Sequence, residues 1–324
     1  MANGTYEMYG QACLTNFDWA WCPPIVDGRA PDIRVELGGL GRFATHAPPS
    51  YQPYARRAGI DPESTPVVDI RRGSDGHYRV SYVDGAEFVI DHTASEIFGV
   101  ARGKLTLDDL IVYLQGPVLG FALRLRGVTC LHGSAVVSGG RAFAVVGQGG
   151  MGKSTSAATF AALGLEVLTD DVLALADDGT CFHVQPGLPR VFLWPASVAA
   201  LFGEADALPR VVSSWDKRYL DLTRNGYRFA RRPAPLRGVY VLGARLPAGA
   251  PPEITPLTGT AALPRLLANT YANDFLDVPL RAEELRIISR LVAEVPIRSV
   301  RAPDDLGALP GIAAAILADF DARP

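Results

Sequence analysis

The chain has 324 residues, of which 48% are hydrophobic and 20% are charged, as is usual for a globular protein. This length allows one large domain or two modest ones. The formal net charge of −3 argues against a nucleic-acid partner held by bulk positive charge.

Signals for secretion or membrane insertion are missing from the sequence. The N-terminal stretch MANGTYEMYGQACLTNF has no basic region followed by an apolar one, which a secretory signal needs. No run reaches the roughly 18 apolar residues of a membrane span. Four cysteines stand far apart without a CxxC pair, namely Cys13, Cys22, Cys130 and Cys181. This pattern is typical of reduced thiols, so we expect a cytoplasmic protein without a membrane partner.

Residues 1–108 predict a β-rich N-terminal domain. Apolar and polar residues alternate in HYRVSYV (77–83) and in AEFVID (86–91), which predicts strands. Asp-Gly pairs at 75–76 and 84–85 predict tight turns. We therefore expect antiparallel hairpins in this part of the chain.

Prolines divide the region before these hairpins. A loop between strand candidates is predicted from Pro48, Pro49, Pro53 and Pro62. Further on, residues 107–126 predict a helix that breaks at Gly116-Pro117, because proline removes a helical hydrogen bond.

A different pattern begins near residue 128. Residues 128–137 predict a strand, 138–140 a turn, and 141–147 a mostly apolar strand. A glycine-rich loop leads to an alanine-rich helix at 153–163, and a strand is expected at 165–177. Strand, loop, helix and strand in this order are typical of a phosphate-binding α/β unit.

The remainder of the chain continues as mixed α/β structure. We expect strands near 189–194, 237–243 and 295–301, and helices near 196–202, 260–270, 281–293 and 309–320.

Residues 147–154 read GQGGMGKS, which matches G-x-x-x-x-G-K-S. Glycines in such a loop let backbone N–H groups point at phosphate oxygens, and the following helix adds its positive dipole end. The motif predicts that Lys153 reaches the β- and γ-phosphates of ATP and that Ser154 contacts Mg²⁺. The nucleotide-binding residues expected here are Gly147, Gly149, Gly150, Met151, Gly152, Lys153, Ser154 and Thr155.

Two adjacent acids, Asp170 and Asp171, close the apolar run LEVL. An aspartate at a strand end near such a loop usually serves Mg²⁺. Where the chain turns, both side chains could face the phosphates. One carboxylate could then hold the metal ion while the other accepts the proton of an attacking hydroxyl.

His132 and several basic residues are further candidates. His132 ends a strand next to the phosphate unit in the sequence and could contact phosphate or transfer a proton, although a lone histidine is more often structural. The charge that develops during phosphoryl transfer also needs a cation. Candidates for it are Arg190, Lys217, Arg218 and Arg237.

The stretch 131–173, from LHGSAVV through GQGGMGKS to LTDDVLAL, resembles the HPr serine kinase/phosphorylase family. His132 precedes Lys153 by 21 residues and Asp170 follows it by 17, spacings similar to those of the family. The resemblance implies that Asp170 is the base that deprotonates a serine, with Ser154 and Asp171 near Mg²⁺. It also implies a functional role for His132.

The resemblance further implies the fold. We expect an α/β protein with a P-loop, HPr-kinase-like (PEP carboxykinase-like) domain at 109–324. The β-rich domain at 1–108 would precede it and could bind the substrate.

A weaker resemblance runs to the C-terminus through PRVFLWP, APLRGVYVL and VPIRSVRAPDDLGALPGI. These segments are similar to HPr-kinase-like proteins encoded beside ribosomally made peptides, including lasso peptides. This implies a peptide or protein partner with an acceptor serine. The long C-terminal signature of true HPr kinases is not found, so neither HPr nor a reverse phosphorylase reaction is predicted.

Other functions are left open by the sequence. A kinase for free serine or a sugar needs a small closed pocket, whereas a peptide kinase needs an open groove. A nucleotide-binding regulator would bind ATP without consuming it. A homo-oligomer is possible, because HPr kinases commonly form one.

Overall fold

The structure, a computed structural model, divides the chain into two compact units. Unit 1 comprises Met1–Val128 with Ala272–Arg281, and unit 2 comprises Thr129–Tyr271 with Ala282–Pro324. The residues described are 4–19, 21–22, 24–25, 28–39, 50–57, 67–213 and 215–323. The division therefore falls at residue 128 and not at the expected residue 108.

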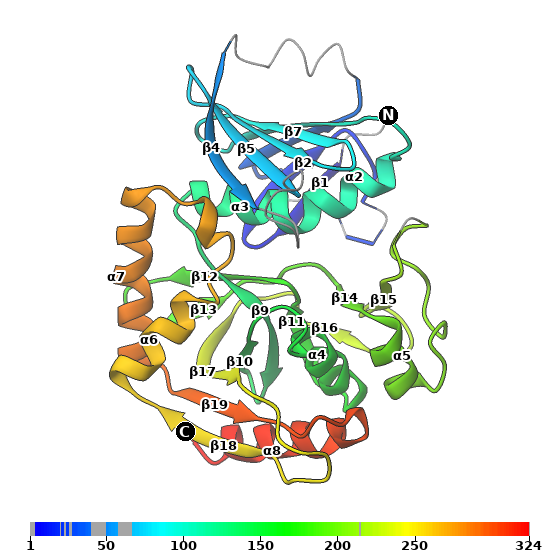
Figure 1. Cartoon of the computed structure of the whole chain (residues 1–324), viewed down its shortest axis with the longest axis vertical. Coiled ribbons are helices and arrows are strands. Elements are labelled where there is room, and N and C mark those ends of the chain that lie inside the picture. The colour runs from blue at the N-terminus through cyan, green and yellow to red at the C-terminus, as the bar shows by residue number, and fades with distance from the viewer. Residues whose placement is uncertain are drawn as a thin grey trace. The chain divides into compact units, whose positions relative to one another are not determined.

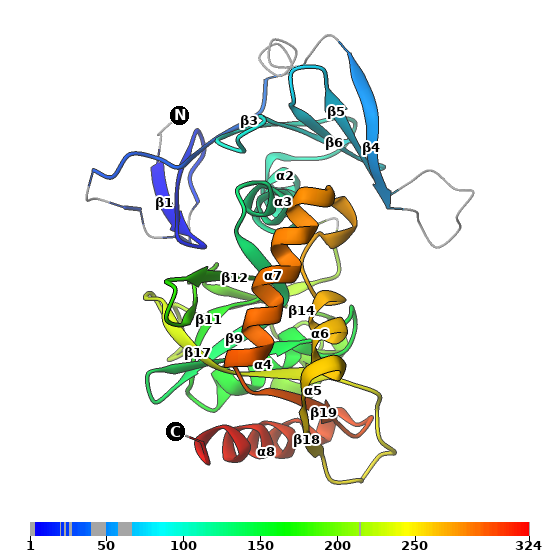
Figure 2. The same ribbon diagram turned by 90° about the vertical axis from the view of Figure 1, so that its left-hand side faces the viewer.

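Unit 1 is built on an eight-stranded sheet with the order β1-β2-β3-β8-β7-β6-β5-β4. Its strands are β1 (Gly4–Met8), β2 (Gln11–Thr15), β3 (Ile33–Leu37), β4 (Tyr51–Arg57), β5 (Val68–Gly73), β6 (Tyr78–Tyr82), β7 (Ala86–Ile90) and β8 (Glu96–Ala101). Figure 2 shows the sheet curving from β1 to β4.

The hairpins expected in unit 1 are confirmed. Strands β5, β6 and β7 pair antiparallel in sequence order. Gly76 and Gly85 in the Asp-Gly turns have φ angles of 87° and 104°, which glycine adopts without strain.

The loop expected around the prolines is wrong at Pro53, which lies within β4. This strand is at the edge of the sheet, so one side of its backbone needs no partner and tolerates a residue without an N–H group. The pairing with β5 also shifts register between Pro53 and Ala55. Pro48, Pro49 and Pro62 lie outside the described residues.

The helical segment of unit 1 does not break at Gly116-Pro117. It runs through α2 (Leu107–Tyr113), a π-helical turn at Leu114–Val118, and α3 (Leu119–Leu125). The wider π turn accommodates the proline within a continuous helical path.

Aromatic contacts explain why these helices belong to unit 1. The rings of Tyr82 and Tyr113 lie 4.2 Å apart, and those of Tyr78 and Phe121 lie 5.5 Å apart. The helices thus cover the apolar face of the sheet, which would otherwise meet water. Residues 1–108 alone would leave that face exposed.

Unit 2 contains a nine-stranded sheet with the path β16-β11-β9-β12-β13-β17-β19-β18, and β10 pairs with β9 and β17. Its strands are β9 (Thr129–Ser138), β10 (Arg141–Val146), β11 (Glu166–Thr169), β12 (Val172–Asp177), β13 (Phe182–Val184), β16 (Arg228–Phe229), β17 (Ala234–Leu242), β18 (Glu253–Leu257) and β19 (Ile297–Arg301). Strands β10, β17 and β19 run parallel. A two-stranded sheet pairs β14 (Arg190–Leu193) with β15 (Arg218–Asp221).

Helices cover both faces of this sheet (Figure 1). One apolar cluster joins the sheet to α4 (Lys153–Ala162), α5 (Pro195–Phe202) and α8 (Leu309–Asp321). A second joins it to α6 (Gly259–Leu267) and α7 (Val278–Glu294). Short 3₁₀ turns lie at Asn273–Phe275 and Leu306–Ala308. The expected mixed α/β architecture is therefore present, with a predominantly β first unit.

The strand expected over 165–177 is interrupted. It forms β11 and β12, which both pair with β9, and Asp170 and Asp171 lie between them. Asp171 has a φ angle of 72°, a left-handed conformation that aspartate adopts more readily than most residues. The turn directs the two neighbouring carboxylates to different partners.

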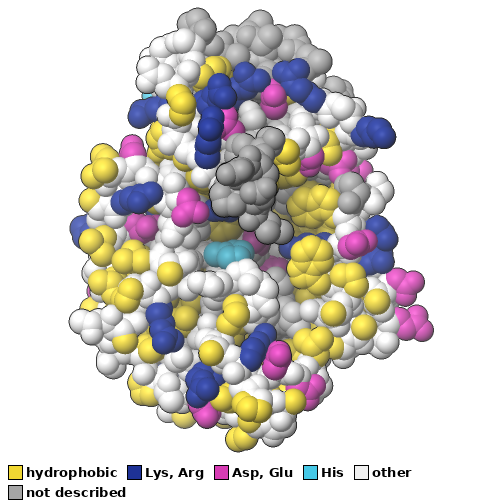
Figure 3. Space-filling view, viewed as in Figure 1, with side chains coloured by type: hydrophobic (Ala, Val, Ile, Leu, Met, Phe, Trp, Pro, Cys, Tyr) yellow, Lys and Arg dark blue, Asp and Glu magenta, His cyan; other side chains and the backbone are white. Residues whose placement is uncertain are grey.

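On the face drawn in Figure 3, basic and acidic side chains are interspersed and do not gather in one patch of a single sign. None of the helices in the described ranges is long and apolar enough to cross a bilayer.

Candidate phosphate-binding site

The glycine-rich loop connects β10 to α4 in unit 2. Gly150 and Gly152 have φ angles of 79° and 99°, so both need the conformational freedom of glycine. Gly152 is the N-cap of the ten-residue helix α4 and has no side chain to occupy the first-turn N–H groups. A Cβ at Gly149 or Gly150 would meet nothing within 4 Å. The loop can therefore present backbone N–H groups to an anion.

Lys153 is the first residue of α4, and its side chain is largely buried. Its ammonium group donates a hydrogen bond of 2.8 Å to the carbonyl of Gln148 in the same loop. Burial lowers the pKa of Lys153, while the nearby carboxylates of Asp171 and Asp170 act in the opposite direction. The cation is thus close to both acids and is held over the loop.

Asp170 is buried, at 5% exposure, with both oxygens engaged. Oδ1 accepts a 2.7 Å hydrogen bond from the Ser134 hydroxyl, and Oδ2 accepts one of 3.1 Å from the backbone N–H of Phe192. Burial raises the pKa of Asp170, and the charge of Asp171 adds to this, although hydrogen bonds from Ser134, Phe192 and Ser154 oppose it. The carboxylate therefore adjoins the Ser154 hydroxyl and holds a proton more readily than an ordinary aspartate does.

Asp171 faces a different set of groups. Its Oδ1 lies 3.3 Å from Nδ1 of His132, and its Oδ2 accepts a 3.1 Å hydrogen bond from the Tyr271 hydroxyl. Burial would raise the pKa of Asp171, but the hydrogen bonds and charges of His132, Lys217 and Tyr271 together lower it. Its side chain is 36% exposed, so this ionised carboxylate can reach a ligand from solvent.

The basic candidates lie in different surroundings. Lys217 is close enough to affect the pKa of Lys153 and of Asp171, and its ammonium lies 5.2 Å from the centre of the Trp194 ring. Arg190 is buried, and its guanidinium lies 3.7 Å from the ring centre of Tyr219 within the small sheet. Contact of Arg190 with phosphate stays a prediction.

The two remaining basic candidates lie on strands. Arg218 begins β15, and Arg237 is an exposed residue of β17. The residues that the structure does bring together are His132, Lys153, Ser154, Asp170, Asp171 and Lys217.

Three further residues contribute to the site beyond those expected from the sequence. Ser134 had a signal, because it lies two residues after His132 on one strand and so shares its face. Tyr271 is 100 residues from Asp171 and had none. Arg245 donates a 2.8 Å hydrogen bond to the carbonyl of Met151 and supports the loop from outside it.

A cavity of about 200 Å³ adjoins the loop. Its lining includes Gly150, Thr155, Ser197, Arg245 and Asp304. The hydroxyls of Thr155 and Ser197 lie 2.9 Å apart there. The cavity thus offers polar groups beside the start of α4.

The donor set fits Mg²⁺. The Ser154 hydroxyl and the carboxylates of Asp170 and Asp171 supply hard oxygen ligands, which Mg²⁺ prefers, usually with waters and substrate phosphates completing its octahedron. The site thus combines backbone N–H groups that can bind an anion, the buried ammonium of Lys153, and two carboxylates whose pKa values are shifted in opposite directions.

Comparisons with known proteins give little further information. No family model matches the chain, and no curated protein matches it. One similar solved structure is the HPr(Ser) kinase/phosphatase from Coxiella burnetii, at 10% sequence identity and a TM-score of 0.33. The match covers 60% of this chain and 97% of that one. At this TM-score the similarity carries no argument about the site.

Proposed function

We propose that this protein transfers the γ-phosphoryl group of ATP to a serine hydroxyl of a peptide or protein. The observation that carries the proposal is the meeting of a glycine-rich loop, a buried lysine and two differently tuned carboxylates at the start of α4. A purely structural turn needs none of these groups, whereas phosphoryl transfer uses all of them.

The loop and Lys153 bind the triphosphate in this proposal. N–H groups of the loop and of the first turn of α4 face the phosphate oxygens, and the Lys153 ammonium neutralises the outer phosphates. Ser154 and Asp171 would hold Mg²⁺, which would supply positive charge to the phosphates. The cavity beside Thr155 and Arg245 offers room for part of the nucleoside.

Asp170 is the proposed base. The pKa of Asp170 is raised toward neutral pH, the range in which a general base works best. The hydrogen bonds from Ser134 and Phe192 fix the direction of the carboxylate. As the serine oxygen bonds to the γ-phosphorus, its proton passes to Asp170 and the bond from phosphorus to the leaving ADP oxygen breaks. Lys153 and Lys217 stabilise the charge that spreads over the phosphoryl oxygens.

One contact favours a second assignment of the two acids. The Ser154 hydroxyl adjoins Asp170, as expected if this acid and not Asp171 serves Mg²⁺. Asp171 would then be the base, with His132 and Tyr271 orienting it. The two assignments differ in which variant retains the binding of Mg²⁺ with nucleotide.

A peptide acceptor is part of the proposal. Strand β4 lies at the edge of the unit 1 sheet and all seven of its residues are at least partly exposed, so an extended peptide could pair with it. The sequence resemblance favours a ribosomally made precursor, such as a lasso-peptide precursor, with a serine near its C-terminus. A cytoplasmic location and a homo-oligomeric state belong to the same proposal.

The test uses the full chain with Mg²⁺ and ATP labelled on the γ-phosphate. Acceptors are free serine, a sugar mixture, and peptides that end in serine or in alanine, with the products identified by mass spectrometry. We expect phosphoserine only in the serine peptides. Labelling of free serine or sugar alone would indicate a small-molecule kinase. Tight ATP binding without turnover on any acceptor would indicate a regulator, and no ATP binding would refute the site.

A further inference from the structure

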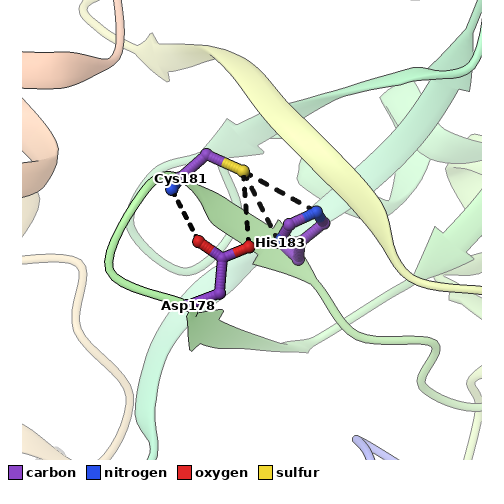
Figure 4. A group of neighbouring side chains, drawn as sticks. All are labelled: Asp178, Cys181 and His183. Atoms are coloured by element: carbon purple, nitrogen blue, oxygen red, sulfur yellow. Dashed lines mark hydrogen bonds and ion pairs between the residues drawn. The ribbon is translucent and has the colours of Figure 1, made fainter.

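A second cluster of metal-binding residue types lies at the turn between β12 and β13. Asp178, Cys181 and His183 point toward one another there (Figure 4). The three come from six consecutive residues, Asp178–His183, so the hairpin alone sets their spacing. Cys181 is a free thiol, and none of the three takes part in the proposed phosphoryl transfer.

The distances match the edges of a tetrahedral metal site. The Cys181 sulfur lies 3.7 Å from Nδ1 of His183 and 3.9 Å from Oδ2 of Asp178, and Nδ1 lies 3.5 Å from that oxygen. Metal bonds of about 2.0–2.3 Å hold neighbouring tetrahedral donors roughly 3.3–3.8 Å apart. All three donors can share one ion once the imidazole turns so that the Nδ1 lone pair points at it, because the Cys181 sulfur now lies equally far from both ring nitrogens.

The arrangement does not resemble a catalytic relay. In a relay the histidine uses one ring nitrogen for the nucleophile and the other for the carboxylate. Here Nδ1 of His183 faces the Asp178 carboxylate, and both ring nitrogens are equally far from the Cys181 sulfur, at 3.7 Å. The carboxylate also approaches the sulfur directly. Three groups that surround one point can share an ion but cannot pass a proton along a line.

Asp178 is prepared to act as a ligand. Its Oδ1 accepts hydrogen bonds from the Thr180 N–H, the Thr180 hydroxyl and the Cys181 N–H, which leaves Oδ2 directed at the cluster. These hydrogen bonds fix the orientation of the carboxylate. The turn thus fixes an anion beside the thiol and the imidazole.

The positive charge of Arg290, which pairs with the neighbouring Asp177, does not oppose a metal ion at the cluster. The Arg290 guanidinium on α7 forms ion pairs with Asp177 and Glu294 at 2.6 Å each, so its positive charge is balanced. The turn lies at the far end of β12 from Asp171. Seven residues at about 3.3 Å each separate them by roughly 20 Å, too far for one ion to serve both places.

We propose that Asp178, Cys181 and His183 bind a divalent zinc-type ion, with solvent in the fourth position. A thiolate and an imidazole favour zinc over magnesium, and the side chain of Asp178 is 50% exposed, which leaves one side open to water. On binding, the thiol releases its proton to solvent as the sulfur–metal bond forms. The ion joins the turn residues to β13 and so clamps the hairpin that leads away from the acidic pair.

Cobalt titration of the untagged, reduced full chain without nucleotide tests this site. Co²⁺ is spectroscopically visible, and a cysteine ligand produces a thiolate-to-metal absorption band. We expect this band at one equivalent and its loss when Zn²⁺ is added. Cys181→Ser should abolish the band, and His183→Gln and Asp178→Asn should each weaken Zn²⁺ binding at least about tenfold.

Two controls make the outcome decisive. His92→Gln changes an exposed histidine elsewhere and should leave both band and affinity unchanged. Cys13 should not substitute, because burial raises the pKa of its thiol to about 12. Absence of the band in the wild-type chain, or its persistence in Cys181→Ser, would overturn the proposal. Circular dichroism checks that each variant is folded, and ATP binding is not needed for any readout.

Discussion

A cluster of polar side chains lies at each end of strand β12. Each cluster contains an aspartate, Asp171 at one end and Asp178 at the other, but the two clusters differ in their other donor atoms. At the Asp171 end the neighbours are hydroxyls, an imidazole and ammonium groups, which suit phosphate and Mg²⁺. At the Asp178 end they are a thiol and an imidazole, which suit zinc. The surrounding donors, and not the aspartates, therefore decide what each end can bind.

The largest effect is expected at the phosphate end. Lys153→Ala should reduce phosphoryl transfer by about a thousandfold, because it removes a buried cation from the developing charge. Lys104→Ala changes an exposed lysine of unit 1 and serves as the matched control. Steady-state transfer to a serine peptide measures both. Near-normal turnover in Lys153→Ala would refute the phosphate site, while the cobalt band should be present in both variants.

Substitutions of Asp170 and Asp171 should impair different properties of the enzyme, namely transfer and the binding of Mg²⁺. Asp170→Asn should lower transfer about a hundredfold or more and keep ATP·Mg²⁺ binding, because it removes a base and leaves a similar shape. Asp171→Asn should instead raise the Mg²⁺ concentration that nucleotide binding and turnover require, because it removes a metal ligand. Calorimetric binding and turnover, measured at several Mg²⁺ concentrations, separate the two. If Asp170→Asn raises the Mg²⁺ requirement and Asp171→Asn does not, the roles are exchanged.

The loop and its flanking elements could be predicted because their signals are local. Gly147, Gly152 and Lys153 specify the turn and the helix start within eight residues. The mostly apolar run before the loop predicts β10, and the alanine-rich stretch after it predicts α4. The position of Asp170 also followed from its spacing. The interruption of the strand beside it did not, because the left-handed conformation of Asp171 occurs without a glycine.

The other features depend on contacts between distant segments. The segment 272–281 joins unit 1 through the Phe121–Phe275 ring contact of 6.0 Å and the Arg57–Asp274 ion pair of 3.2 Å. Periodicity within 272–281 cannot reveal either partner. For the same reason the contribution of Tyr271 to the acidic pair was out of reach.

Ligand-dependent stability should separate the two ends of β12. A ligand at 100 times its dissociation constant stabilises the folded chain by about 2.7 kcal/mol. Zn²⁺ should therefore raise the melting temperature of the wild type and of Lys153→Ala but not of Cys181→Ser. Mg²⁺ with ATP should stabilise the wild type and Cys181→Ser but not Lys153→Ala. Loss of both responses in a single variant would show that the ends are not independent.

The pH dependence of stability should have opposite signs at Asp170 and Asp171. The pKa of Asp170 in the folded chain is above the ordinary value of 3.8. The stability of the fold therefore falls as the pH rises from 3.8 through the folded-state pKa, because the folded chain disfavours the ionised carboxylate. Asp170→Asn should thus stabilise the fold at pH 7. For Asp171 the folded-state pKa is below 3.8, so its contribution is present at higher pH and is lost as pH falls, and Asp171→Asn should destabilise at pH 7.

Thermal melting from pH 7 down to pH 4 measures this pair. The advantage of Asp170→Asn over the wild type should shrink as the pH is lowered, because the wild-type acid then takes up its proton. Melting shifts of the same sign in both variants at pH 7 would contradict the opposite environments of the two carboxylates.

The smallest effect is expected from Tyr271→Phe, which removes one hydroxyl and keeps the ring. The lost 3.1 Å hydrogen bond reaches a carboxylate that is 36% exposed, so solvent compensates in part and the cost should stay under about 1 kcal/mol. Transfer should fall a few-fold, and the acidic limb of Mg²⁺ binding should move to higher pH, because the bond helps to keep the pKa of the metal ligand Asp171 low. Tyr113→Phe removes a similar tyrosine–aspartate bond, to Asp84 in unit 1, and should not move that limb. An unchanged limb in Tyr271→Phe would show that the tyrosine only supports the fold, and the difference between the ends of β12 would then rest on His132 and Lys217 alone.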